Sequence, residues 1–220
     1  MREKLCIVFL LDRLNEWFMD MWLEHYKKYN AHIVCLVESC SKEVYEKLLN
    51  SKVEVHFWGN YWGGANTRNH IIDIVRKKYN PEWIMLTHAD EIFEDKMFSE
   101  IDNLMGDPTN VWYRFPIYHF WECFTHYRND GAWKGGMMDV MRLWKNNVLP
   151  RYVFGGKGQV HHVQSAPNDI GNFPGKRLDI RVKHFSNANK GAWQAKCFVR
   201  GKNWAIYNEP KELELVEWKE

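Results

Sequence analysis

Two adjacent carboxylates stand where a predicted strand of this sequence ends. Asp90 and Glu91 follow the apolar run at residues 83–86, with only three residues between. Their side chains should emerge at the end of a buried strand, where a ligand would lie. Hard oxygen donors there suit Mg²⁺ or Mn²⁺ bridging phosphates, because such ions usually keep few protein ligands. In the structural alternative, Asp90 caps a helix beginning near residue 93 and Glu91 is a solvated first-turn acid.

Three further polar side chains occupy comparable positions. Asp12 directly follows the apolar run at residues 5–11, and Glu38 directly follows the run at residues 32–37. Arg68 lies at the start of a predicted helix, where backbone N–H groups, the helix dipole and the guanidinium all favour a phosphate. Each has a structural alternative: a helix cap for Asp12, an exposed loop acid or cap for Glu38, and a solvated helix arginine for Arg68.

Alternating strands and helices must position these groups. Residues 5–11 are apolar throughout, as in a strand covered on both faces. Apolar runs predict further strands, and apolar residues at helical spacing predict helices; the strands are 32–37, 53–58 and 83–86, and the helices 14–26, 44–49 and 71–79. This order predicts an α/β fold with a mostly parallel central sheet flanked by helices on both faces. The polar groups that follow the strands should then share one edge of the sheet.

The second half of the sequence is less regular. Residues 111–115 and 140–144 read as strands, and the aromatic, polar segment at residues 116–136 has no helical period. A long irregular segment of this kind is expected to carry function or mobility. No repeat, linker or domain boundary stands out, so residues 1–220 are predicted to form one domain.

Composition excludes several classes of protein. The net charge of +2 is too balanced to indicate a nucleic-acid or membrane surface. The five cysteines show no CxxC spacing, which argues against a disulfide framework or zinc knuckle and favours a reducing, cytoplasmic compartment. No stretch approaches the length of a membrane span. The twelve tryptophans are compatible with a cleft that holds sugar or base rings, or with a tryptophan-rich core.

Two motifs in order carry a resemblance to a known family. The sequence at residues 63–69, Gly-Gly-Ala-Asn-Thr-Arg-Asn, is followed by a helix and by Trp-Ile-Met-Leu-Thr-His-Ala-Asp-Glu at residues 83–91. This arrangement resembles family 2 type glycosyltransferases with the GT-A fold. Later segments are similar to the same family, so that the resemblance covers about residues 5 to 200: these are residues 127–133, 142–144, 161–162 and 182–185.

The resemblance implies a metal site for a nucleotide-sugar donor. Asp90 matches the acid that ligates the ion holding the donor diphosphate, and Glu91 matches the acid that contacts sugar or metal shell. His88 replaces the first acid of the pattern; a neutral imidazole can coordinate a transition ion or hydrogen-bond a ribose, which favours Mn²⁺ over Mg²⁺. His184 resembles the late histidine that completes the metal shell in some GT-A enzymes, although a surface or core histidine is the alternative.

The resemblance also assigns donor contacts. Glu38 matches the acid that binds the uracil or ribose, which favours a UDP-sugar, and Asp12 belongs to the first nucleotide-contacting loop. Asn66 and Arg68 lie in the motif that faces the donor. Lys190, with the later Lys196 and Arg200, could close over the diphosphate as a lid; solvated basic residues are the alternative.

Inverting sugar transfer needs a base that takes the proton of the acceptor hydroxyl. Asp130 is the predicted base, because its loop lies beside Trp121, Tyr127 and Trp133, which could stack on a sugar. A turn aspartate before glycine is the structural alternative. Glu122 is the rival base.

The predicted function is a metal-dependent glycosyltransferase that moves a sugar from a nucleotide sugar to a glycan, lipid-linked or protein acceptor. A non-catalytic carbohydrate-binding protein on a degenerate GT-A scaffold is the second hypothesis, motivated by His88. A nucleotidyltransferase is the third. It is disfavoured because no glycine- and arginine-rich phosphate loop lies near the first strand.

Overall fold

A computed structural model describes residues 4–58, 65–148, 151–152, 170–191, 193–194, 198 and 213–220. The helical elements of these residues are η1 (Glu16–Phe18), α1 (Met19–Tyr26), α2 (Lys42–Leu49), α3 (Ala65–Lys78), α4 (Lys96–Gly106), η2 (Gly131–Trp133) and η3 (Ile170–Asn172). The strands are β1 (Leu5–Leu11), β2 (His32–Val37), β3 (Glu54–Phe57), β4 (Trp83–His88), β5 (Glu91–Phe93), β6 (Trp112–Trp121), β7 (His126–Arg128), β8 (Met138–Lys145), β9 (Gly175–Arg177), β10 (Val182–Asn187) and β11 (Leu215–Glu217).

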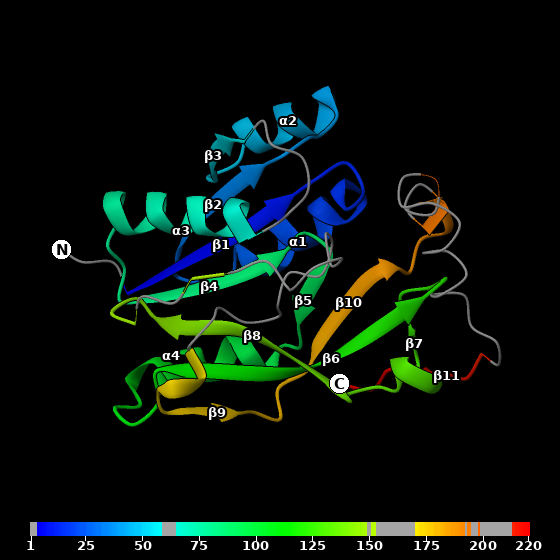
Figure 1. Ribbon diagram of the computed structural model, residues 1–220. Helices are drawn as coiled ribbons and strands as arrows, with labels where there is room; N and C mark the ends of the chain where they lie inside the picture. Colours follow the sequence, from blue (N-terminus) through cyan, green and yellow to red (C-terminus); the bar gives the residue numbers. More distant parts are fainter. Residues whose placement is uncertain are drawn as a thin grey trace.

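The described strands form one mixed sheet (Figure 1). Four neighbouring strands in the order β3-β2-β1-β4 are parallel, as predicted for the first half of the chain. Beyond β4 the sheet continues through β8, which is antiparallel to both β4 and β6. Strand β10 then runs parallel to β6 and antiparallel to the short β5. The predicted α/β fold is confirmed, with a parallel core and a mixed second half.

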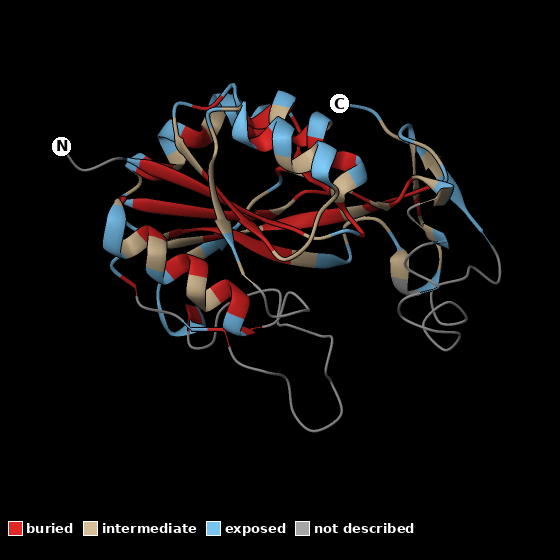
Figure 2. Cartoon of the chain, turned by 90° about the horizontal axis from the view of Figure 1, so that it is seen from above, coloured by how far each residue is buried: buried red, intermediate tan, exposed pale blue. Residues whose placement is uncertain are grey.

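Strand β1 is central because it is apolar on both faces. Its seven residues are all buried. Alternate side chains enter two separate clusters, one beneath α1, α2 and α4 and the other beneath α3. Figure 2 shows the buried strands running between helices on the two sides of the sheet. The period-2 alternation of an entirely apolar strand therefore builds both cores at once.

Three local predictions need correction. The strand predicted at residues 83–86 continues to His88. The helix expected near residue 93 does not begin there, because Glu91–Phe93 forms strand β5 against β10 and α4 begins at Lys96. Asp90 therefore lies in a tight strand connection and is not a helix cap.

The segment at residues 116–136 is more regular than predicted. Strand β6 extends through Trp121, and β7 and η2 follow it. Its pairing partners explain the difference: β6 is hydrogen-bonded to β8 on one side and to β10, some 65 residues later, on the other. Local sequence pattern cannot report a partner so distant in the chain.

Within the described helices, none combines the length and apolar character needed to cross a membrane.

Candidate functional site

The carboxyl ends of β1, β2, β3, β4, β6 and β10 lie at one edge of the sheet, called here the rim. Strands β1, β2 and β4 are parallel. Because β4 and β6 are both antiparallel to β8, they run in the same direction, and β10 runs with β6. The arrowheads of β1, β4, β6 and β10 accordingly point the same way in Figure 1. Residues that follow β4 and β6 in the sequence are thus brought to the same edge.

Glu91 and Arg142 form a buried ion pair behind the rim. The Nε and Nη2 groups of Arg142, on β8, donate to the two carboxylate oxygens of Glu91 at 2.7 and 2.6 Å. Burial by itself would raise the pKa of Glu91, but Arg142 and other neighbouring groups lower it to about 2. The backbone N–H of His88 also donates to Glu91, at 3.2 Å. Glu91 therefore fixes the shape of the turn after β4.

His88 is paired with Arg68 of α3. The Nη2 of Arg68 lies 2.9 Å from Nε2 of His88, which must accept the hydrogen because the guanidinium has only donors. Burial lowers the pKa of His88 to about 4, so the ring is neutral near pH 7. Its other nitrogen, Nδ1, lies 3.9 Å from Glu91. His88 is therefore a neutral hydrogen-bond acceptor for Arg68.

Arg68 is a buried cation with unused donors. Its Nε and Nη1 have no hydrogen-bond partner within the described part of the chain. Burial lowers the pKa of Arg68 to about 10, which leaves it charged at neutral pH. The ring of Tyr152 lies over the guanidinium at 5.2 Å, and the Tyr152 hydroxyl likewise has no partner among the described residues. Unsatisfied donors at a helix start are an anion-binding feature.

The backbone of Tyr152 is held in place by Asn69. The Asn69 side chain donates to the Tyr152 carbonyl at 2.8 Å and accepts from the Tyr152 N–H at 2.9 Å. The two residues of the Arg-Asn motif therefore have different roles in the structure. Arg68 faces the rim, and Asn69 holds Tyr152, whose ring covers Arg68.

The remaining predicted donor contacts differ in their surroundings. Glu38 accepts a hydrogen bond from the Thr67 hydroxyl at 2.8 Å, which ties the end of β2 to the first turn of α3. Asp12 accepts from the backbone N–H groups of Leu14 and Asn15 at 2.7 and 3.1 Å. These bonds hold the turn after β1, and the capping alternative for Asp12 is not observed, because the N-cap residue of η1 is Asn15 and no side chain caps that helix. Asn66 is exposed in the first turn of α3.

Asp90 and His184 face one another at the rim. Oδ2 of Asp90 lies 3.6 Å from Nε2 of His184, and both side chains are largely buried. The Phe185 N–H donates to the Asp90 carbonyl at 2.8 Å, so the backbone fixes this approach. On the far side of His184, its Nδ1 lies 2.7 Å from Nδ1 of His119, a buried residue of β6. Two predicted metal ligands are therefore adjacent, and a second histidine stands behind one of them.

These residues fit a divalent cation only as a two-ligand site. No three His, Cys, Asp or Glu side chains of the described ranges are grouped around a common point. The Asp90 and His184 atoms are too far apart for a good hydrogen bond, yet two ligands each roughly 2.1 Å from one ion can be separated by such a distance. Ions that keep water or phosphate ligands need no more protein donors than this.

His119 was not predicted from the sequence. Burial and, after it, the neighbouring His184 hold the pKa of His119 well below its ordinary value. The signal available was a histidine within the otherwise apolar and aromatic run at residues 115–121. Its importance depends on β10, which supplies His184 from a distant part of the chain.

The two predicted bases have contrasting environments. Both carboxylate oxygens of Asp130 are bound by Arg128, through Nε at 2.9 Å and through Nη2. These hydrogen bonds hold the pKa of Asp130 below its ordinary value, which weakens it as a base. Glu122 is exposed at the end of β6 with a φ of 54°. A left-handed backbone at a residue other than glycine is strained, and such strain concentrates at functional sites.

Aromatic side chains surround Arg128. Its guanidinium lies 4.8 Å from the ring of Trp121 and 5.5 Å from that of Trp133. Trp133 also meets His119 edge-on at 4.6 Å. The tryptophans near the predicted bases are thus partly engaged by protein cations and rings, and Trp121 additionally contacts Trp193.

Other predicted elements lie away from these contacts or outside the described residues. Lys190 is exposed in a helical turn after β10. Lys196, Arg200, the histidines at 161–162 and the glycines at 63–64 lie outside the described residues.

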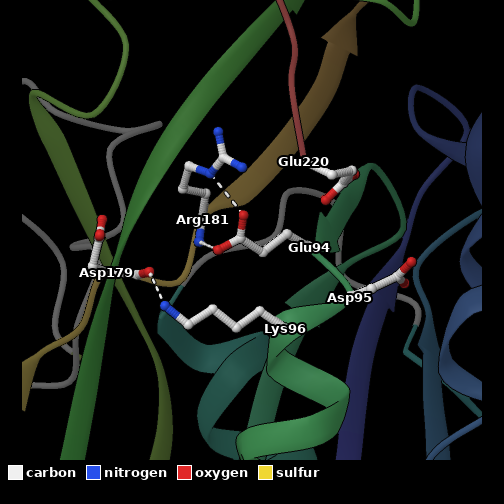
Figure 3. Close-up of a pocket in the computed structure, with 6 residues that line it drawn as sticks. All are labelled: Glu94, Asp95, Lys96, Asp179, Arg181 and Glu220. Carbon is white, nitrogen blue, oxygen red and sulfur yellow. Dashed lines mark hydrogen bonds and ion pairs between the residues drawn. The ribbon is translucent and has the colours of Figure 1, made fainter.

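A polar pocket of about 470 Å³ lies at the opposite end of the β5 and β10 pair from the Asp90 and His184 contact. Figure 3 shows that its lining is internally paired: Arg181 binds Glu94, and Lys96 donates to the Asp179 carbonyl. Glu220, which also lines it, is bonded to Lys183 and Trp218. Its lining has four acids, Glu94, Asp95, Asp179 and Glu220, and two cations, Lys96 and Arg181, so this pocket offers less to an anionic donor than Arg68 does.

Known proteins resemble this chain in structure but not detectably in sequence. No family model and no curated protein matches it. A protein described as a nucleotide-diphospho-sugar transferase of Desulfovibrio desulfuricans G20 aligns over 93% of this chain and 94% of its own, at a TM-score of 0.53 and 10% identity. TarS of S. aureus aligns at 0.53 and 10% identity over 95% of this chain and 40% of its own.

A third structure broadens the comparison. A 4-diphosphocytidyl-2C-methyl-D-erythritol synthase aligns over 82% of this chain and 90% of its own, at a TM-score of 0.51 and 9% identity. Identities this low establish the fold alone. The chain therefore has the α/β fold of GT-A glycosyltransferases, which nucleotidyltransferases share.

Proposed function

We propose that this protein transfers a sugar from a nucleotide-sugar donor, bound at the rim, to an acceptor hydroxyl. The observation that carries the proposal is the position of Arg68, which reaches the turn after β4 that also presents Asp90 to His184. Among the described residues, Nε and Nη1 of Arg68 have no hydrogen-bond partner. A nucleoside diphosphate needs both a cationic side chain and a metal ion for its phosphates. The shared fold supports this placement at the ends of parallel strands.

Arg68 would bind the donor diphosphate through Nε and Nη1 while His88 holds Nη2. The hydrogen bond to His88 orients the guanidinium without neutralising it, as a carboxylate would. We assign His88 to this supporting role in preference to metal coordination. Glu38, at the end of β2, would contact the ribose or base, and Thr67 orients its carboxylate.

Asp90 and His184 would hold a divalent cation. When bound, the ion would neutralise charge on the departing diphosphate. A ligand set of one carboxylate and one imidazole favours Mn²⁺ over Mg²⁺, because imidazole suits transition ions. Glu91 would act on this site indirectly, since Arg142 engages both of its carboxylate oxygens.

Glu122 is the better placed of the two candidate bases. It lies at the same edge of the sheet as Asp90, its carboxylate is exposed, and its backbone N–H is anchored to the Asn187 carbonyl at 2.8 Å. Asp130 would instead hold Arg128 between two tryptophans. Glu122→Gln should lower kcat by roughly 10²- to 10⁴-fold with folding intact. Asp130→Asn should mainly reduce stability, because it leaves Arg128 without its carboxylate.

Calorimetric titration with UDP, GDP and dTDP, with and without Mn²⁺, tests the donor site. Wild-type protein should bind at least one of them, and Arg68→Gln should weaken that binding by about tenfold or more. Lys77→Gln, which removes an exposed cation from the same helix, is the matched control and should change little. The proposal fails if no nucleoside diphosphate binds, or if Arg68→Gln and Lys77→Gln behave alike.

Nucleotidyl transfer is the second candidate, favoured by the fold shared with the diphosphocytidyl synthase. The two activities differ in their products. Pyrophosphate released from CTP or UTP in the presence of a sugar phosphate would support nucleotidyl transfer. Release of a nucleoside diphosphate from a nucleotide sugar would support glycosyl transfer.

A further inference from the structure

The two histidines at the rim, His119 and His184, are a matched pair across two strands. They stand opposite one another in the parallel register of β6 and β10. Their Nδ1 atoms are 2.7 Å apart, which is a short hydrogen bond between two ring nitrogens. We call these residues the histidine pair. Only His184 was expected to have a role.

A hydrogen bond between two Nδ1 atoms contains one hydrogen. Which of the two rings carries that hydrogen decides whether Nε2 of His184 is protonated. If His184 donates, its Nε2 is a bare lone pair; if His119 donates, Nε2 of a neutral His184 carries hydrogen. Nε2 of His184 is the atom that faces Asp90. The histidine pair therefore controls whether that atom can accept a cation.

The contact with Asp90 favours the first arrangement in the presence of a cation. An N–H aimed at a carboxylate usually closes to a distance of about 2.7 to 3.2 Å. Here the two atoms stand 3.6 Å apart, although the backbone bond from Phe185 to Asp90 brings their strands together. The lone pair on Nε2 of His184 and the Oδ2 atom of Asp90 are at a separation at which both can bind the same positive ion.

The surroundings of His119 fix the orientation of its ring. It is buried on β6, and the ring of Trp133 packs edge-on against it at 4.6 Å. Its Nε2 has no hydrogen-bond partner within the described residues, so Nδ1 alone fixes the ring through hydrogen bonding. Histidines that ligate metals usually donate their second N–H to a fixed acceptor, and loss of such an acceptor typically weakens metal binding.

We propose that His119 is a positioning residue: by accepting the Nδ1 hydrogen of His184, it fixes the tautomer whose Nε2 serves a divalent cation opposite Asp90. This inference rests on the cation site of the proposed function. His119 itself touches neither the ion nor the donor in this arrangement. Its effect is exerted through the orientation and hydrogen placement of His184.

Two variants of His119 separate positioning from bulk packing. In His119→Asn, the amide oxygen can take the place of Nδ1 as the acceptor, whereas His119→Leu removes the acceptor and keeps an apolar side chain. His126→Leu, which changes a histidine on neighbouring β7, is the control. Mn²⁺ binding to the 220-residue chain with UDP is measured by electron paramagnetic resonance, and folding by circular dichroism.

The expected result is a loss of Mn²⁺ affinity of about 10- to 100-fold in His119→Leu, substantial rescue in His119→Asn, and little change in His126→Leu. In the Mn²⁺-free protein, which avoids paramagnetic broadening, ¹⁵N spectra with Zn²⁺ should place hydrogen on Nδ1 of His184 in wild type and His119→Asn. Folded His119→Leu should show a mixture.

Three outcomes would overturn the inference. One is unchanged Mn²⁺ affinity in His119→Leu while Asp90→Asn abolishes Mn²⁺ binding. This result would support the proposed cation site but exclude a positioning role for His119. Another is hydrogen on Nε2 of His184 in the Zn²⁺-loaded wild type. The third is UDP binding by wild type with no Mn²⁺ or Zn²⁺ binding, which removes the cation from the proposed function and the inference with it.

Discussion

The parallel and mixed halves of the sheet bury different kinds of side chain. In the parallel half, β1 consists entirely of buried apolar residues, and β2 is apolar after its first residue. In the mixed half, β6, β8 and β10 carry buried or largely buried polar groups, namely His119, Arg142, His184 and Asn187. The parallel half supplies a rigid frame with strand ends at the rim, and the mixed half supplies much of the polar chemistry.

The ion pair of Glu91 and Arg142 links the two halves. Glu91 follows the last parallel strand, and Arg142 lies on the first antiparallel one. Their geometry is bidentate, which is the strong form of a carboxylate and guanidinium contact. Glu91 also accepts the backbone N–H of His88, so the pair ties β8 to the turn after β4.

Removing one member of this pair should have the largest effect on stability. Arg142→Leu leaves the Glu91 carboxylate buried without its cation, and should lower the free energy of unfolding by roughly 3–5 kcal/mol. The double variant Glu91→Leu, Arg142→Leu should recover part of this loss, because no buried charge remains. Urea unfolding measures the free energy of unfolding of Glu91→Leu, Arg142→Leu and the double variant. A double variant as unstable as the sum of its singles would show that the pair does not act as a unit.

Acid should abolish most of the stabilisation that ionised Glu91 gives to the folded protein. Its folded pKa of about 2 is below its ordinary value, so its stabilisation is complete above about pH 4.5 and is lost as the pH falls through 2. Glu91→Gln should therefore be less stable than wild type at pH 7, with the difference shrinking between pH 4.5 and 2. Glu43→Gln, an exposed acid on α2, is the control. A difference that stays constant with pH contradicts the assigned pairing.

A smaller loss of stability is expected when the buried indole N–H of Trp22, which packs against the parallel half, is removed. The indole N–H of the fully buried Trp22 donates to the Thr87 hydroxyl at 3.0 Å, while its ring stacks on Phe9 at 3.9 Å. Trp22→Phe removes the donor and some volume, and should cost about 1–3 kcal/mol. Thermal unfolding of this variant beside Trp17→Phe, at an exposed site, measures the cost. Equal stability of the two variants would mean that Trp22 matters less to this frame than its burial indicates.

The smallest effect should come from an exposed pair of the same chemistry as Glu91 and Arg142. Arg177 binds Asp139 through Nε at 2.9 and 3.0 Å, but Arg177 is half exposed. Arg177→Ala should change the free energy of unfolding by less than about 1 kcal/mol. A loss comparable to that in Arg142→Leu would show that burial does not govern the strength of these pairs.

The sequence predicted the parallel half closely because its information is local. The apolar runs at residues 5–11 and 32–37 coincide with β1 and β2, since each strand is buried by its own composition. Strand β6 was predicted only in part, because β10 pairs with it from a distant part of the chain. Burial in that half arises from tertiary pairing and leaves little periodic signal.

The candidate site divides in the same way. Asp90 and His184 were named from the sequence, and the structure brings them together. The partners that define their roles were not predicted, because the bond of His88 to Arg68 and that of His184 to His119 join separate elements. Residue type indicates that a group can do chemistry, whereas its role depends on which group faces it.

Anomalous diffraction at the manganese edge, from crystals grown with UDP and Mn²⁺, tests the central claim most directly. The account predicts a single strong peak within bonding distance of Oδ2 of Asp90 and Nε2 of His184, with the diphosphate contacting both the ion and Arg68. Nucleotide bound elsewhere on the molecule, or a manganese peak that excludes Asp90 and His184, would contradict it.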